Sequence, residues 1–288
     1  MIIVNGQPAS DAQEEKQYRI IDAHCHIYPE KIAAKAVAAI GRFYGKEMEE
    51  DGTPDSLVKE GESIGVEKYV VHSTATTVHQ VRAINDYIFS EMQRHPEFIG
   101  FMTLHNEMTD EAIEQEVELA LSRGMKGVKL HPDFQKFNID DAENLYRVTA
   151  GKLPVLLHMG DVRYDYSSPL RLEKMAKKYP EQIFIGAHFG GYSVWDKVGC
   201  LKDLPNVYFD TSSSLAFLDK SRAADLIRSF GFERYMFGTD FPMWKHKEEL
   251  DRFLSLPLTE EEREAILYGN AARLLGVADE TKTPAQAE

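Results

Sequence analysis

The sequence predicts an α/β fold in which eight parallel strands alternate with helices and close into a (β/α)8 TIM barrel. Short apolar runs alternate eight times with longer amphipathic stretches, which is typical of a parallel sheet with helical crossovers. The 288 residues suit one barrel of the usual ~250 residues, and no linker-like change of composition divides them. An open doubly wound sheet is the alternative, but it predicts a glycine-rich phosphate loop after an early strand, and the sequence has none.

The expected strands are short apolar runs at residues 19–27, 68–73, 98–105, 127–131, 154–159, 183–188, 207–211 and 235–239. Helical spacing of apolar residues is clearest at residues 80–93, 110–123, 168–179 and 221–230. The last helix begins with a capping pattern at Thr259, runs towards Leu275 and ends at Gly276. We therefore expect an N-terminal extension over residues 1–17, one barrel domain over residues 18–277 and a polar tail over residues 278–288.

The longest connection, residues 28–67, separates the first two expected strands. It contains an alanine-rich helix at residues 31–40, followed by glycines and acidic residues up to residue 53. A long connection at the C-terminal face of a barrel is typical of a lid. We expect this insertion to cap the site.

The charge and the cysteines exclude several classes of protein. Asp and Glu number 47 against 33 Lys and Arg, and the net charge of −14 argues against non-specific binding to nucleic acid or anionic membranes. The two cysteines, Cys25 and Cys200, rule out a disulfide framework and indicate a cytoplasmic setting; we expect both to be packing residues. No apolar stretch approaches the ~20 residues of a membrane-spanning helix, and no signal-peptide pattern is present.

Histidines gather at the ends of the expected strands. Seven of the ten lie within or at the end of a strand: His24, His26, His72, His105, His131, His158 and His188. The last two strands contribute Asp210 and Asp240. In an α/β barrel these ends converge on one face, where active sites are built.

The pair His24 and His26 ends the first strand. Because a strand alternates faces, both imidazoles point the same way and can hold one cation, whereas Cys25 points towards the helices. We expect His158 and Asp240 to act as further metal ligands, because each ends a later strand.

Other candidates carry less weight. Lys129 and His131 share a face of the fourth strand, and a lysine inside a barrel is costly unless it is paired or modified. His72, His105 and Asp210 are as well suited to support ligands as to be ligands. The remaining histidines, His79, His95 and His246, fall on helices or loops, and we expect them to be solvated.

Imidazole and carboxylate together suit a divalent transition ion, with Zn²⁺ the first expectation and Mn²⁺, Fe²⁺ or Co²⁺ also compatible. Three histidines and one aspartate leave room for a water whose pKa the ion lowers towards 7. Asp240 would accept its proton, and His188 would polarise the substrate or act as a general acid–base group.

The ordered set of His-x-His after the first strand, His after the fifth and sixth, and Asp after the eighth resembles the amidohydrolase superfamily. Three phrases are most similar to its amidohydrolase-related branch: Lys129-Leu-His-Pro, Gly186-Ala-His-Phe-Gly-Gly and Gly269-Asn-Ala-Ala-Arg-Leu-Leu-Gly. That branch includes aminocarboxymuconate-semialdehyde decarboxylase and related lactonases, hydratases and decarboxylases. The resemblance covers residues 20–276.

The resemblance implies one metal held by His24, His26, His158 and Asp240, with His188 as the catalytic histidine. Other branches carry a carboxylated lysine that bridges two metals, and Lys129 lies in a similar place. In such a two-metal site His188 would become a ligand. We favour one ion.

The leading hypothesis is a metal-dependent hydrolase that acts on a C–O or C–N bond of a small anionic substrate. Lys129, Arg163 and Lys245 could supply positive charge for that substrate. The alternative is a non-oxidative carboxy-lyase or hydratase that uses the same metal site, and a third class is a binding protein that has lost its activity. A homodimer is common among such barrels, but nothing in the sequence decides it.

Overall fold

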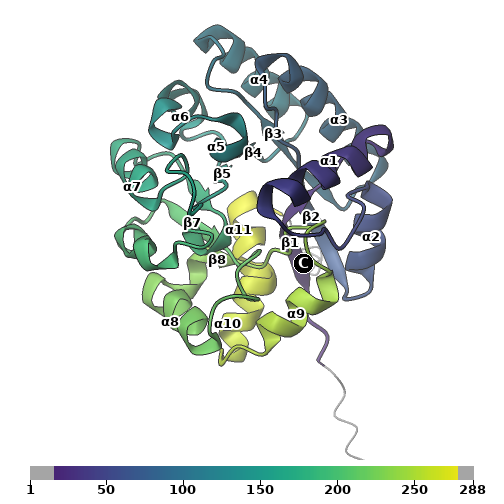
Figure 1. Ribbon diagram of the computed structural model, residues 1–288, viewed down its shortest axis with the longest axis vertical. Helices are drawn as coiled ribbons and strands as arrows, with labels where there is room; N and C mark the ends of the chain where they lie inside the picture. The colour runs from purple at the N-terminus through teal and green to yellow at the C-terminus, as the bar shows by residue number, and fades with distance from the viewer. Residues whose placement is uncertain (1–15, 278–288) are drawn as a thin grey trace, which may run out of the picture.

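The computed structural model describes residues 16–277, and it confirms the expected TIM barrel (Figure 1). The eight strands are β1 Ile20–His26, β2 Val66–His72, β3 Phe98–Thr103, β4 Gly127–Leu130, β5 Val155–Leu157, β6 Phe184–Gly186, β7 Val207–Asp210 and β8 Tyr235–Met236. Consecutive strands pair in parallel. Backbone hydrogen bonds join β1 to the segment that follows β8, because the N–H groups of Ala23 and His26 donate to the carbonyls of Phe237 and Phe241, each at 2.8 Å. Apart from Lys16 and Gln17, the expected extension and tail lie outside the described residues.

Helices surround the strands (Figure 1). They are α1 Glu30–Tyr44, α2 Pro54–Glu62, α3 Val81–Arg94, α4 Asp110–Ser122, α5 Pro132–Gln135, α6 Glu143–Thr149, α7 Pro169–Lys178, α8 Lys220–Phe230, α9 His246–Leu254, α10 Glu260–Glu264 and α11 Asn270–Leu275. The expected capping box at Thr259 is present, but a π-helical turn, Ala265–Gly269, interrupts the single helix that the sequence predicts there. Within residues 16–277, no helix combines the length and the apolar character needed to cross a bilayer.

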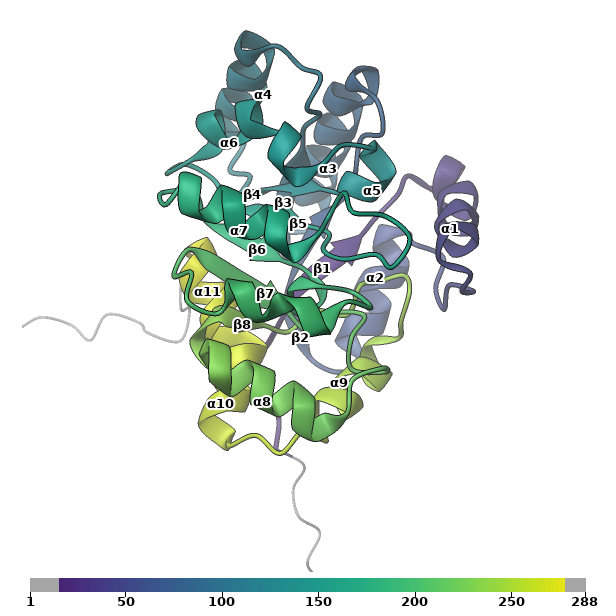
Figure 2. The same cartoon turned by 60° about the vertical axis from the view of Figure 1, so that its left-hand side comes forward.

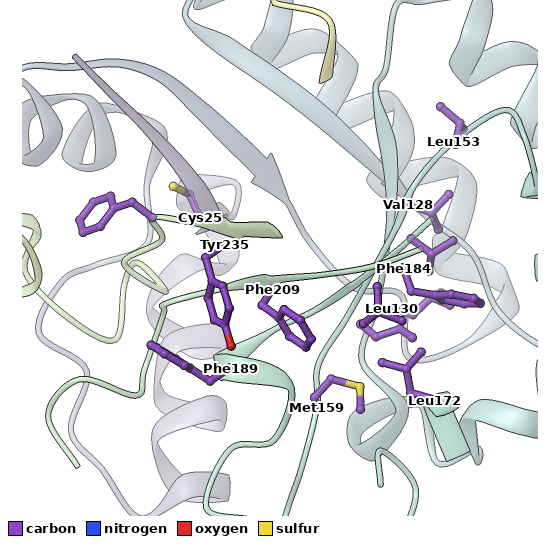
Figure 3. Packing of buried hydrophobic residues seen from close by; sticks show 14 of the residues in the cluster. Cys25, Val128, Leu130, Leu153, Met159, Leu172, Phe184, Phe189, Phe209 and Tyr235 are labelled. Carbon is purple, nitrogen blue, oxygen red and sulfur yellow. The ribbon is translucent and has the colours of Figure 1, made fainter. Parts of the chain in front are cut away.

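Two apolar clusters form the core. The smaller one joins inward-facing strand residues such as Val70 and Ile185 to Ala271 and Leu275 of α11. The larger one joins the outer faces of the strands to the surrounding helices, and Figure 3 shows part of it around Phe184. Each large apolar side chain buried in this way stabilises the fold by roughly 1.5–3 kcal/mol. The barrel is therefore a rigid support for the side chains at its mouth.

Strand β1 contains a bulge that a simple alternation does not predict. Its register against β2 shifts by one residue between Asp22 and Cys25. Ala23 belongs to the inner cluster and Cys25 to the outer one, so the extra residue turns His24 towards the mouth. Cys25 is fully buried, as expected, and burial raises the pKa of its thiol, which keeps it protonated. Cys200 is only partly buried and packs against the outer cluster.

Both α1 and α2 lie in the connection between β1 and β2. Helix α1 stands apart from the other helices beyond the end of β1 (Figure 2). Ala33 is its one buried residue. The segment that follows α1 is held by the β8–α9 connection, because the N–H groups of Glu49 and Glu50 donate to the carbonyl of Pro242, each at 3.1 Å. A capping role for α1 remains a prediction.

Candidate active site

Three side-chain atoms converge where β1 and the end of β8 meet. His24 Nε2 and His26 Nε2 lie 3.3 Å apart, and each lies 3.4 Å from Asp240 Oδ1. The other oxygen of Asp240 accepts a hydrogen bond from the hydroxyl of Ser213, which leaves Oδ1 directed at the two imidazoles. Three Lewis bases therefore face one point.

Asp210 fixes which nitrogen of His24 faces that point. Its Oδ2 lies 2.8 Å from His24 Nδ1, and both side chains are fully buried. Burial raises the pKa of the Asp210 carboxyl, but the charge and hydrogen bond of His24 more than offset this and lower it below its usual range. An ionised Asp210 keeps the proton on Nδ1, so Nε2 presents its lone pair.

The donor set fits a divalent metal. The separations of 3.3–3.4 Å are close to the edge of a tetrahedron with metal–ligand bonds of about 2.0–2.1 Å. Burial lowers the pKa of His26 to about 4, so its imidazole is neutral at pH 7. Burial works against the Asp240 carboxylate, but His24 and His26 hold its pKa well below the usual range. Neutral imidazoles and an ionised carboxylate are the forms that bind a cation.

A second group of imidazoles continues the site. His158 Nδ1 lies 3.0 Å from His188 Nε2, and His188 Nδ1 lies 3.1 Å from the carbonyl oxygen of Ser212. On the other side, the hydroxyl of Tyr44 lies 2.9 Å from His131 Nε2 and 3.3 Å from His158 Nε2. These contacts form a chain of groups that can exchange protons, from α1 to the loop after β7.

The backbone is strained at the two residues that the sequence marks as catalytic. His188 and Asp240 both have φ near 61°, in the left-handed region that costs other residues than glycine about 1–2 kcal/mol. The Asp240 N–H donates to the carbonyl of His24 at 3.0 Å, and the His188 N–H donates to Asp210 at 3.0 Å. Hydrogen bonds to other residues of the site thus stabilise the strained backbone conformation.

Asp22 joins the strands that carry the convergent atoms. Its carboxylate accepts hydrogen bonds from the N–H of His24 at 3.1 Å and from the N–H of Thr239 at 3.0 Å. His246 Nε2 lies 3.0 Å from the same carboxylate. The expectation that His246 is solvated is wrong, because α9 packs its imidazole against the outer side of β1, fully buried. His95 is partly buried, with its ring stacked on that of Phe98, whereas His79 is exposed as expected.

Lys129 is fully buried, and its Nζ lies 3.0 Å from His24 Nε2. Burial lowers its pKa to about 8. Arg163 lies at the rim, where it forms a two-armed ion pair with Asp161. Lys245 is exposed. Of the cations that the sequence suggests for an anionic substrate, Lys129 alone contacts the convergent atoms among the described residues.

The weaker histidine candidates differ in position. The ring of His72 packs against those of His24 and His26, with centroids 4.9 and 4.4 Å away. Within residues 16–277, neither of its ring nitrogens finds a hydrogen-bond partner. His105 accepts a hydrogen bond from the N–H of Glu107 at 3.3 Å and serves the local turn.

A narrow pocket of about 20 Å³ opens at these groups, with His26, His131, His158, His188 and Asp240 in its wall. Apolar side chains and Tyr44 complete the wall: Ile40, Met48, Phe134, Pro242 and Met243. None of these wall residues is among the candidates that the sequence pattern indicates. The alanine-rich helix pointed to the segment that carries Ile40 and Tyr44, but not to the side chains that turn inward.

Histidines and an aspartate that converge at the carboxyl ends of barrel strands define a metal-dependent enzyme. The amidohydrolase family model matches residues 21–277. The chain therefore belongs to the amidohydrolase family, whose metal-dependent enzymes include hydrolases and carboxy-lyases. The search of curated proteins finds no match.

Solved structures share the fold at low sequence identity. The uncharacterised TIM-barrel protein Bb4693 from Bordetella bronchiseptica is 22% identical with a TM-score of 0.73, over 90% of this chain and 98% of that one. A 2,6-dihydroxybenzoate decarboxylase bound to 2,6-dihydroxybenzoate is 19% identical with a TM-score of 0.71, over 90% and 100%. A dihydroxybenzoic acid decarboxylase from Polaromonas sp. JS666, bound to manganese and 2-nitroresorcinol, is 16% identical with a TM-score of 0.65, over 90% and 97%.

Proposed function

We propose that the protein is a metal-dependent, non-oxidative decarboxylase that acts on a small carboxylic acid. The observation that carries the proposal is the convergence of His24, His26 and Asp240 at the mouth of this barrel. Two of the three solved structures compared above are decarboxylases with the same fold. They favour the carboxy-lyase alternative over the hydrolase that the sequence analysis placed first.

His24, His26 and Asp240 would hold the ion, with His158 as the fourth ligand. A bound divalent ion would supply Lewis-acid stabilisation of a substrate oxygen. The imidazole-rich set is compatible with Zn²⁺, which the sequence analysis expects, and with Mn²⁺, which the Polaromonas relative binds. We propose one ion. Lys129 would bind a negatively charged group of the substrate beside His24. The alternative is that Lys129 is carboxylated and bridges two metal ions.

The reaction breaks one C–C bond and forms one C–H bond. The electron pair of the carboxylate bond remains on the substrate carbon, CO₂ leaves, and the carbon takes up one proton. We assign proton transfer to His188, because its Nε2 faces the pocket residue His158 and its ring is oriented by Ser212. Burial lowers its pKa to about 4, so at pH 7 the ring is neutral; it would take one proton from solvent water and pass that proton to the substrate carbon.

The test measures CO₂ and acid release in parallel, on benzenoid and aliphatic carboxylic acids and on lactones and amides. We expect CO₂ from at least one acid, lost on metal removal and restored by Zn²⁺ or Mn²⁺. Asp240→Asn should lower turnover by at least 10²-fold, since the Asn side chain tolerates the left-handed backbone but lacks the charge. His79→Asn, at an exposed histidine, is the control that should keep full activity. Hydrolysis of a lactone or amide without any CO₂ release would overturn the proposal in favour of the hydrolase.

A further inference from the structure

A groove of about 340 Å³ lies beside the narrow pocket. Its walls are mainly apolar: Tyr28, Ala36, Ala39, Ile40, Phe43 and Phe134. A cavity of about 150 Å³ is enough to bind benzene. The groove therefore has room for a substituted ring, whereas the pocket at the histidines, about 20 Å³, has room for a small group only.

Helix α1 presents an apolar stripe to this groove and not to the core. Ala36, Ala39, Ile40 and Phe43 follow the spacing i, i+3, i+4 and i+7, which places them on one helix face. None of the four is fully buried. The stripe thus stays available to a ligand.

The groove is held open at one end by contacts of α1. The hydroxyl of Tyr44 bonds to His131 at 2.9 Å, and the guanidinium of Arg163 donates to the carbonyl of Phe43 at 2.6 Å. These contacts anchor the C-terminal end of α1. The volume beneath the helix is preformed, so a ligand gains the apolar contact without ordering the helix first.

One polar group in the groove lacks a partner. The Oγ1 of Thr74 is buried, and no hydrogen-bond partner for it exists among the described residues. The neighbouring Thr76 hydroxyl, by contrast, donates to Gln80 at 3.0 Å. Because a buried hydroxyl without a partner is costly, a ligand in the groove towards which the Thr74 side chain turns its hydroxyl gains affinity. A neutral hydroxyl or carbonyl group on the ligand would serve.

The groove is continuous with the reaction site, since His26 and Phe134 line both. No Lys, Arg, Asp or Glu of the described chain lines it. A second carboxylate on the ligand would lose its hydration there without gaining a counter-charge. The groove therefore selects an uncharged body.

We propose that this groove binds the body of the substrate, an uncharged apolar portion of about one ring that carries a neutral hydrogen-bonding group towards Thr74. The carboxylate then points past His26 to the reaction site. Ala36 and Ala39 set the size of the body, because their small side chains leave the volume under α1 free. This inference rests on the proposed decarboxylation and names its substrate class, a monocarboxylic acid with a ring-sized neutral body.

The test compares Ala39→Leu, which fills the groove, with Ala38→Leu, which places the same side chain on an exposed position of the same helix outside the groove. For a ring-bearing acid, we expect Ala39→Leu to raise KM at least tenfold with little change in kcat and an unchanged metal content. KM for an aliphatic acid without a ring should not change. Ala38→Leu should behave as the wild type. An unchanged KM for the ring-bearing acid in Ala39→Leu would overturn the proposal.

Thr74→Val tests the polar contact, because valine keeps the shape and removes the hydroxyl. We expect it to raise KM for a hydroxylated ring acid at least fivefold and to leave KM for the deoxy analogue unchanged. Equal effects on both acids would contradict the assignment of Thr74.

A binding measurement separates failure of the groove from failure of the proposed reaction. Calorimetry with p-cresol, a neutral ring with one hydroxyl, requires no catalysis. Binding to the wild type that weakens at least tenfold in Ala39→Leu supports the groove even where no acid releases CO₂. Absence of binding to the wild type, or equal binding to both proteins, would overturn the groove, whatever reaction is found.

Discussion

A single proton position decides what His24 can bind. Asp210 holds that proton on Nδ1, and the lone pair of Nε2 is then available beside His26 and Asp240. The same carboxylate accepts the backbone N–H of His188, so one buried aspartate fixes the ring of His24 and the backbone of His188. Carboxylates in this position typically raise metal affinity by orienting the imidazole.

Asp210→Asn should weaken metal binding by roughly 10–100-fold, because the amide keeps the shape but loses the charge that fixes the tautomer. Competitive titration of the metal-free protein with a chelating dye measures this. Asp225→Asn, at an exposed aspartate of α8, is the control. Unchanged affinity in Asp210→Asn would show that His24 does not need its partner.

The sequence permits prediction of His24, His26, His188 and Asp240 because these residues end strands, and parallel strand ends meet at one face. His246 could not be predicted in the same way. It begins a helix, and only tertiary packing turns its ring against Asp22. Tyr44 reaches His131 across 87 positions of sequence, a distance that no local pattern encodes.

Helix α1 is attached to the loop after β5 by the side chain of Arg163. Arg163 pairs with Asp161 in its own loop, donates to the carbonyl of Phe43 at 2.6 Å, and lies 4.4 Å from the ring of that residue. Residue type alone suggests that this arginine supplies positive charge for an anionic substrate. Its contacts instead attach helix α1 to the loop after β5, a role that we call a strap.

Arg163→Ala should loosen α1 without unfolding the barrel, since the helix has a single buried residue of its own. Hydrogen exchange followed by mass spectrometry should show at least tenfold faster exchange in the peptide covering residues 30–44. Arg147→Ala, which removes an exposed ion pair with Asp110, should leave that peptide unchanged. Wild-type exchange in Arg163→Ala would contradict the role of a strap.

The C-terminal boundary of α1 is set by tertiary contacts and not by the local sequence. The sequence predicts a helix over residues 31–40 because Gly41 favours an end there. The helix continues through Gly41 to Tyr44 and ends at Gly45, whose φ of 65° provides the left-handed cap. Contacts of Phe43 and Tyr44 with the barrel outweigh the low helix propensity of glycine, and those contacts belong to the tertiary structure.

The free energy of unfolding of the barrel depends on pH through Glu249, a residue outside the site. Glu249 of α9 is fully buried, and burial raises its pKa from 4.5 to about 7, although Arg252 opposes the shift. Between these pH values the folded protein holds a proton that the unfolded chain has released. The free energy of unfolding contributed by this residue therefore falls as the pH rises from about 4.5 to about 7.

Glu249→Gln should remove that dependence. The difference in free energy of unfolding between the variant and the wild type should therefore increase by on the order of 1–3 kcal/mol from pH 4.5 to pH 8. Urea unfolding at four pH values between these limits measures the difference. Glu248→Gln, on the same helix and paired with the same arginine but half exposed, should follow the wild type. Parallel curves for Glu249→Gln and wild type would contradict the shift.

We propose that one divalent ion binds where His24, His26 and Asp240 converge. Anomalous diffraction from crystals of the protein loaded with Mn²⁺ locates such an ion without any assay of activity. We predict a single peak per chain at bonding distance from His24 Nε2, His26 Nε2 and Asp240 Oδ1. A peak held instead by His131, Asp133 and His158, the neighbouring group of possible ligands, would contradict the claim, as would the absence of any peak in crystals soaked with the ion.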